Sequence, residues 1–190
     1  MKTIPFAQVK RKDRSVQDEA WIRALLRRAA TGVLATVDQG QPFVNVNLFV
    51  FDEATDAIYM HTAREGRTRK NVQGDERVCF SVSEMGRLLP AATALDMSVE
   101  YSSVVVFGRA SIIADPEEAQ RALQLLLDKY FPHLQPGRDY RRITPEELAR
   151  TRVYRIEIEK WSGKRKKVEE DFPGAFLYGG KSGSKGRDLV

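Results

Sequence analysis

The sequence has few of the residues that build metal and redox sites. Its 190 residues include one cysteine, Cys79, and two histidines, His61 and His133. A single cysteine excludes an intrachain disulfide and a cysteine-rich metal site, and we expect no bound metal ion. Cys79 stands in a strand-like apolar run, which favours burial as a small hydrophobic residue over a reactive thiol.

Long apolar runs are also absent. The longest, such as Val104–Phe107, are far shorter than the ~20 residues that a membrane-spanning helix needs. Residues 1–20 carry charges early and lack the apolar core of a secretory signal. We therefore expect no membrane segment and a cytoplasmic protein.

Basic residues are in modest excess. The formal net charge is +5, and 42% of the residues are hydrophobic and 30% charged, which is typical of a globular chain with one domain. The cations are spread over the segments 10–14, 64–70 and 164–167 and the C-terminal end. No recognised nucleic-acid module accompanies them, so a nucleic-acid partner is disfavoured.

The patterning divides the chain into an N-terminal arm (1–16), a domain (17–168) and a basic, glycine-rich tail (169–190) that we expect to be flexible. Within the domain, β-rich runs alternate with polar turns. Strands are predicted at 32–37, 43–51, 57–62, 77–83, 98–114 and 152–160, the first two forming a hairpin. The stretch 84–97 has neither helical nor strand period and predicts a loop with one helical turn.

Helix signals occur at three places. Ser15 and Asp18 predict a capping box that opens a first helix. Asp115 and Thr144 each precede a proline, as an N-cap does before the first helical residue.

Gly108, inside a predicted strand, suggests a bulge or a close backbone approach. Because strands follow one another without crossover helices, the pattern favours a mainly β fold, an antiparallel barrel or sandwich with peripheral helices.

The most informative stretch is 58–71. A strand-like run leads through His61 and Thr62 to a glycine and several cations, including Arg67, Arg69 and Lys70. Hydroxyls, backbone amides and cations are what a phosphate monoester requires. The same composition fits a loop whose cations face water, and His61 fits a hydrogen-bonded histidine at a strand end. The residues alone leave these alternatives open.

Five blocks together are similar to a known family. They are 32–37, 42–48, 58–70, 101–110 and 154–164. In this order and spacing they resemble the flavin-binding split-barrel superfamily related to pyridoxamine 5'-phosphate oxidase. The last two blocks resemble its nitroimidazole-resistance (Nim) branch. The resemblance covers about residues 17–168.

The resemblance implies a six-stranded antiparallel split β-barrel that forms a homodimer and binds FMN at the subunit interface. The residues that it places near the phosphate and ribityl chain are His61, Thr62, Arg67, Arg69 and Lys70. Those along the edge of the flavin ring are Asn45, Val46 and Asn47. Those that approach the flavin, from the same or the partner subunit, are Tyr101, Ser103, Trp161 and Lys164. His61 is the candidate catalytic residue.

The chain also departs from the family pattern. Asn45, Val46 and Asn47 stand where many members carry a proline, and Ser102 replaces an arginine common in the Nim branch. The resemblance assigns no role to the long basic region after Trp161. The substrate-phosphate motifs of true pyridoxine-phosphate oxidases are absent near the C-terminus, which disfavours that activity.

We therefore expect an FMN-dependent oxidoreductase acting on a small molecule. The Nim branch implies a nitro-aromatic acceptor such as a 5-nitroimidazole, with a nicotinamide or another reductant as electron donor. The alternatives are a non-catalytic protein that stores or senses flavin or haem, haem ligation by one histidine being open, and, less favoured, a basic nucleic-acid-binding domain.

Overall fold

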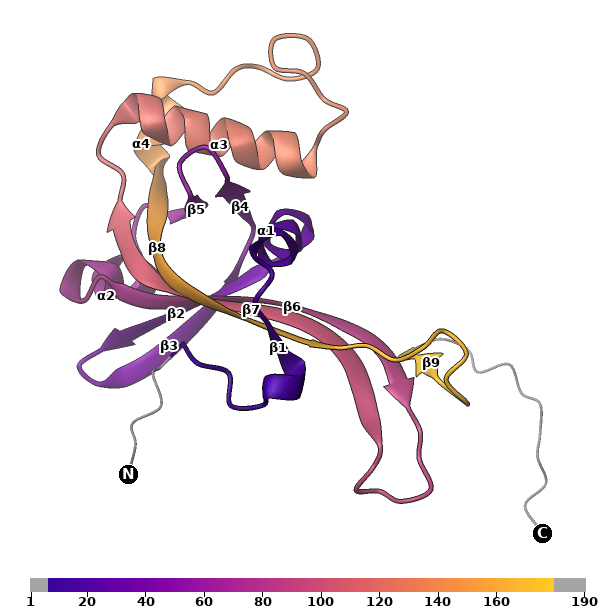
Figure 1. The fold of residues 1–190 in the computed structure, drawn as a ribbon. Coiled ribbons are helices and arrows are strands. Elements are labelled where there is room, and N and C mark those ends of the chain that lie inside the picture. Colours follow the sequence, from indigo (N-terminus) through magenta and orange to yellow (C-terminus); the bar gives the residue numbers. More distant parts are fainter. Residues whose placement is uncertain (1–6, 180–190) are drawn as a thin grey trace.

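One continuous antiparallel sheet dominates the computed structural model, which describes residues 7–179 (Figure 1). Seven of its strands follow one another in the order β3-β2-β6-β7-β8-β5-β4. The bounds are β1 (Ser15–Val16), β2 (Gly32–Asp38), β3 (Gln41–Asn47), β4 (Phe49–Asp52), β5 (Ala57–Ala63), β6 (Arg77–Leu89), β7 (Ser98–Ile112), β8 (Thr151–Lys166) and β9 (Phe176–Leu177). β1 pairs with β8 and β9 with β6. The sheet curls without closing, because β3 and β4 are the two ends of its path.

The predicted mainly β, antiparallel fold is confirmed, but the single strand expected over 43–51 is two strands. β3 pairs with β2, whereas β4 pairs with β5. The chain changes partner at Leu48, which lies between them. The path therefore has seven strands where six were predicted. The β-rich run in the sequence is continuous, so the sequence pattern does not reveal the position at which the pairing strand changes.

The prediction of a loop over 84–97 was wrong for 84–89 and is confirmed for 90–97. β6 continues to Leu89, and together β6, β7 and the end of β8 run out from the barrel as a long arm (Figure 1). A register shift between Met85 and Leu88 interrupts the alternation, which is why this part of the strand shows no period of two. Similarly, β8 runs to Lys166, past the end predicted at 160.

Four α-helices and one short 3-10 helix accompany the sheet in the described part of the chain. They are η1 (Lys12–Arg14), α1 (Glu19–Arg28), α2 (Arg67–Gly74), α3 (Pro116–Tyr130) and α4 (Pro145–Arg150). Asp18 alone caps α1, its carboxylate accepting from the Ala20 amide at 2.9 Å. The expected capping box is absent, because Ser15 belongs to β1. The caps at Asp115 and Thr144 are confirmed, the latter as a full capping box.

Two hydrophobic clusters hold these elements together. The larger lies between α1 and the inner face of the curled sheet, and it contains Leu25, Phe49 and Phe80. The smaller lies where α3 crosses β4, β5 and β8, and it contains Tyr59 and Leu126 (Figure 1). The smaller cluster fixes α3 over the outer side of β5, which shapes one of the two pockets described below.

Gly108 marks the predicted bulge, which is confirmed. The register between β7 and β8 shifts between Phe107 and Gly108. A Cβ atom at Gly108 would lie 1.9 Å from the carbonyl oxygen of Glu157. Only glycine allows this approach of the two backbones.

The N-terminal arm (1–16) and the C-terminal tail (169–190) were predicted from composition. Within the N-terminal arm, β1 pairs with β8, and within the C-terminal tail, β9 pairs with β6. Residues 1–6 and 180–190 lie outside the described residues. No helix within 7–179 is long and apolar enough to cross a lipid bilayer.

Candidate functional site

The cations of the segment predicted to bind phosphate lie in the first turn of α2. The alternative to phosphate binding was a solvated loop, but Arg67 begins a helix that runs to Gly74. Gly66 precedes the helix with a φ of 153°, and no side chain caps its N-terminus. The first amides of α2 therefore lack an intrahelical acceptor and carry the positive end of the helix dipole, which suits an anion.

A pocket of about 330 Å³, here called the α2 pocket, opens beside this N-terminus. Its residues are Asp38, Gln41, Phe43, Gly66, Arg67, Lys70 and Asn71. The Arg67 guanidinium lies 5.2 Å from the centre of the Phe43 ring. The Lys70 ammonium donates to the Asp38 carboxylate at 2.8 Å. Two cations and one carboxylate thus face the same space.

Asparagines of β3 join this pocket to the sheet. Asn45 donates to Asn47 Oδ1 at 3.3 Å and to Thr68 Oγ1, on α2, at 3.4 Å. Asn47 donates back to the Asn45 carbonyl at 2.9 Å. Asn71 donates to Thr36 at 2.8 Å, while its own amide oxygen is buried and has no partner among the described residues. Polar groups of β3 and α2 therefore meet on one face of β3.

Arg69 and Thr62 lie on a different side of α2. Arg69 donates to the Arg64 carbonyl at 3.3 Å and pairs with Glu65. Its Nε is buried and has no hydrogen-bond partner within residues 7–179. The Thr62 hydroxyl lies 3.1 Å from that of Tyr154, whose pKa is raised by burial. The predicted clamp thus has two parts, Arg67 with Lys70 and Arg69 with Thr62.

His61 is separated from Thr62 although the two are adjacent in the sequence. Side chains of a strand alternate between its faces, and His61 lines a second pocket, here called the α3 pocket, of about 310 Å³ between β5, α3 and α4. His61 is exposed at its mouth. Neighbouring side chains still desolvate the imidazole and lower its pKa. The structure does not place His61 with the cations of α2.

Tyr101, Ser103 and Lys164 lie together elsewhere. Ser103 is the cross-strand partner of Lys164, and the Lys164 ammonium lies 5.8 Å from the centre of the Tyr101 ring. Val46, on β3, is 64% exposed and faces away from its neighbours Asn45 and Asn47. No hydrogen bond or ion pair between described residues links Tyr101, Ser103 or Lys164 to α2.

Trp161 packs against the larger hydrophobic cluster. The Arg23 guanidinium of α1 lies 5.0 Å from the centre of its ring. The alternation of β8 turns Trp161 away from the face that carries Lys160 and Lys164. Its position in the structure is that of a residue at the edge of the core.

Phosphate is the group that the α2 pocket fits best. An uncapped helix N-terminus and two converging cations, Arg67 and Lys70, supply donors to an anion without a rearrangement of the fold. Sequence reasoning missed Phe43 and Thr68, which line or support this site. Phe43, Asn45 and Asn47 are spaced two residues apart in one predicted strand. This spacing places their side chains on the same face, and it was the signal that could have identified Phe43.

Other candidate groups are weaker. The Cys79 thiol is half-buried, and burial raises its pKa, which disfavours the reactive thiolate. Within the described residues, no three His, Cys, Asp or Glu side chains gather in a way that could hold a metal ion.

A sequence model of the family described as pyridoxamine 5'-phosphate oxidase matches residues 18–165. The chain belongs to this family. No curated protein matches it significantly in sequence. Membership agrees with the resemblance seen in the five sequence blocks.

Solved structures share the fold of this family member at low sequence identity. The flavocytochrome Anf3 from Azotobacter vinelandii superposes with a TM-score of 0.74 at 21% identity, covering 97% of this chain and 90% of that one. The FAD and heme binding protein from Mycobacterium smegmatis gives 0.73 at 23%, covering 82% and 74%. A proposed 5-nitroimidazole antibiotic resistance protein from Bacteroides thetaiotaomicron gives 0.66 at 22%, covering 80% and 86%. At these identities the likeness establishes the fold alone.

Proposed function

We propose that this chain is an FMN-binding oxidoreductase whose α2 pocket holds the cofactor phosphate. The observation that carries the proposal is the uncapped N-terminus of α2, with Arg67 and Lys70 facing one pocket. Each hydrogen bond to a charged group contributes about 1.5–3 kcal/mol. An anion is the ligand that both cations and the first amides of the helix would bind.

The residues of β3 would orient the rest of the cofactor. Asn45 and Asn47 are tied to each other and to Thr68, so their side chains are already fixed before a ligand arrives. A flavin, when bound, supplies the electron chemistry, while the protein positions it and adjusts its surroundings. The α2 pocket is too small for a whole flavin, so the ring would extend from it along β3.

The same proposal includes a homodimer with the cofactor at its interface. Cross-strand register lines up Val44, Ala35, Cys79, Phe107 and Lys160 on one outer face of the sheet. On this face Val44 is 62% and Val46 64% exposed. Large exposed apolar patches mark interaction sites. A second copy of this chain is the proposed occupant.

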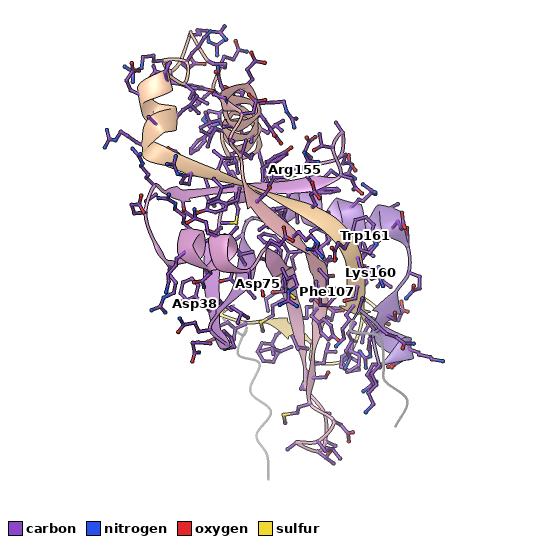
Figure 2. All side chains as sticks on the ribbon, turned by 90° about the vertical axis from the view of Figure 1, so that its left-hand side faces the viewer. Asp38, Asp75, Phe107, Arg155, Lys160 and Trp161 are labelled. Carbon is purple, nitrogen blue, oxygen red and sulfur yellow. The ribbon has the colours of Figure 1, made fainter. Side chains whose placement is uncertain are left out.

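The position of the predicted site residues supports a dimer. Tyr101, Ser103 and Lys164 continue the outer face, whereas Asn45 and the cations of α2 lie on the other side of β3. In Figure 2 Asp38, which marks the α2 pocket, lies well apart from Lys160, which marks the outer face. One copy of the chain does not bring these groups together, but a two-fold partner can supply the missing group to each site.

A small nitro-aromatic molecule is the proposed electron acceptor. Support comes from the resemblance to the Nim branch and from the fold shared with the Bacteroides protein. A nicotinamide or another reductant is the proposed donor. The proposed compartment is the cytoplasm, which suits the single free cysteine.

One neighbour in fold is named as a flavocytochrome and another as an FAD and heme binding protein. These names keep a haem-binding role as the second candidate. The α3 pocket beside His61 measures about 310 Å³. An apolar cavity of ~150 Å³ holds one benzene. The α3 pocket therefore suits one or two rings better than a porphyrin, and flavin is the favoured cofactor.

The test is the absorbance of the purified protein reconstituted with FMN. We expect flavin bands and no Soret band, and the double substitution of Arg69 and Lys70 by alanine should abolish flavin retention while the protein stays folded. Unchanged FMN affinity in that variant would overturn the phosphate assignment. Anaerobic reduction followed by a 5-nitroimidazole then separates an enzyme, which is reoxidised at once, from a flavin store, which is not.

A further inference from the structure

The α3 pocket is built from apolar and aromatic side chains. It is lined by Leu48, His61, Leu123, Leu126, Leu127, Tyr130, Phe131, Tyr140, Arg141, Ile143, Glu147 and Thr151. These residues come from the β3–β4 junction, β5, α3, the segment that leads to α4, α4 itself and the start of β8. Nothing in the sequence blocks that indicate a flavin points to this pocket, because most of its wall lies outside them.

The wall is held in place by specific contacts. Gln124 of α3 donates to the Tyr140 hydroxyl at 2.9 Å, and the Tyr140 carbonyl accepts from the Gly137 amide at 2.7 Å. The Tyr130 hydroxyl lies 2.8 Å from the Ala30 carbonyl oxygen and 3.0 Å from that of Phe49, and it accepts from the Phe49 amide at 3.0 Å. The pocket is therefore preformed, as small-molecule sites usually are.

Nearly every polar group of this wall is already satisfied. Arg141 pairs with Glu147 at 2.7 Å, which balances the charge at the rim. The Tyr130 and Tyr140 hydroxyls have the partners given above. The His61 imidazole is the exception, since within residues 7–179 it makes no hydrogen bond. Because desolvation also lowers its pKa, the ring is neutral near pH 7 and offers a nitrogen that can accept a hydrogen bond.

We propose that the α3 pocket is a separate binding site for a neutral aromatic molecule of one or two rings that carries a hydroxyl or N–H group directed at His61. The volume of about 310 Å³ admits such a molecule and excludes a flavin. The aromatic side chains favour a planar ligand. The paired rim charges disfavour an anion, which the α2 pocket would take instead. The site stands on its own contacts and does not depend on flavin binding.

The probes are 2-naphthol and naphthalene, which differ by the hydroxyl group alone. Titration calorimetry of the full chain should show saturable binding of both, with 2-naphthol the tighter. His61→Phe keeps a ring of similar shape and removes the acceptor, so it should weaken 2-naphthol about fivefold and leave naphthalene unchanged. Equal losses for both probes would overturn the role of His61.

A second pair of variants tests the location. Leu127→Trp fills the pocket and should weaken both probes at least tenfold, whereas Gln120→Trp, at an exposed position of the same helix, should weaken neither. If Leu127→Trp does not fold, Leu48→Trp fills the mouth from a position that is 47% exposed. Absence of saturable binding by the unsubstituted protein, or binding unaffected by a filled pocket, overturns the proposal. FMN content, measured in the same samples, reports on the α2 pocket independently.

Discussion

Lys70 donates a hydrogen bond to Asp38 at 2.8 Å, which joins α2 to the end of β2. Both side chains line the α2 pocket. Lys70 is 69% exposed and Asp38 35%, so the pair adds little to stability, in the range of 0–1 kcal/mol measured for surface pairs. Its consequence is electrostatic, because a phosphate entering the pocket meets a cation that a carboxylate already partly neutralises.

Substitutions at these two positions should therefore change FMN affinity in opposite directions. Lys70→Ala removes a charged donor and should weaken FMN tenfold or more. Asp38→Asn removes the competing negative charge and should tighten FMN about fivefold. Fluorescence quenching of FMN during titration measures both. Arg64→Ala, in the same basic segment but outside the pocket, is the control, and a decrease in affinity with Asp38→Asn would contradict the electrostatic account.

Much of the fold follows from local patterns, and the site follows less well. The hairpin of β2 and β3, the cap at Asp115 and the bulge at Gly108 each have a local chemical cause that the sequence displays. The partner change at Leu48 and the arm beyond Met85 depend on pairing between distant segments, and a register shift hides the second. For the site, residue types indicated an anion, but the two pockets that separate His61 from Lys70 are formed by segments distant in sequence, α3 beside His61 and β3 beside Lys70.

The contact between Gly108 and Glu157 predicts a large loss of stability on substitution. Gly108→Ala places a Cβ atom 1.9 Å from a backbone carbonyl, which cannot rotate away. We expect destabilisation of about 1–3 kcal/mol or more. Gly74→Ala, at the end of α2, meets nothing within 4 Å and should stabilise by about 0.4–1 kcal/mol. Urea denaturation measures both, and a Gly108→Ala variant as stable as the native protein would refute the assignment of the bulge.

Lys129 gives the stability of the protein a specific pH dependence. Its ammonium is half-buried, donates to the Ala29 and Phe49 carbonyls at 2.8 and 3.0 Å, and has its pKa lowered to about 8 by desolvation. Between pH 8 and the ordinary lysine value of 10.5, the unfolded chain therefore holds more protons at this position than the folded chain. The contribution of Lys129 to the free energy of unfolding consequently rises with pH across this window.

Lys129→Met removes this titration and isolates its effect. The free energy of unfolding of the native protein minus that of the variant should increase steadily from pH 7.5 to pH 9.5, as measured by urea denaturation at each pH. After deprotonation, the neutral Lys129 amine still has N–H groups that can donate to both carbonyls. Loss of hydrogen bonds therefore does not reverse the sign of the pH dependence. A flat or falling difference would show that the folded protein does not desolvate Lys129.

Arg87 and Glu100 hold the segment after β8 against the arm. Arg87 forms a bidentate pair with Glu100 at 2.9 Å and donates to the carbonyls of Glu169 and Glu170 at 2.9 and 2.7 Å, while the Val168 amide donates to Glu100 at 2.9 Å. These contacts lower the pKa of Glu100 to about 2, the Arg87 hydrogen bonds being the largest cause. Charge-assisted, bidentate geometry makes this the principal anchor of the segment.

Glu100→Gln should release that segment without unfolding the barrel. Hydrogen exchange at residues 168–178 and their cleavage by proteinase K should both become faster, and exchange in β2 and β5 should not change. Glu84→Gln, on the neighbouring strand β6, breaks only the exposed pair with Arg28 and serves as the control. Equal protection of 168–178 in both variants would mean that β9 pairing, rather than Glu100, anchors the segment.

The proposed dimer interface is tested most directly at Val46. A two-fold axis places each substitution in the interface twice, so Val46→Glu introduces two buried or opposed carboxylates per dimer. We expect sedimentation equilibrium to give a dimer for the native protein at tens of micromolar and a monomer for the variant. Gln120→Glu, exposed on α3, adds the same charge away from this face and should stay dimeric.

Because the two halves of the proposed cofactor site would come from different copies, Val46→Glu should also lose FMN, although it leaves the α2 pocket intact. A variant that is monomeric but keeps the native FMN affinity would place the whole cofactor site within one subunit.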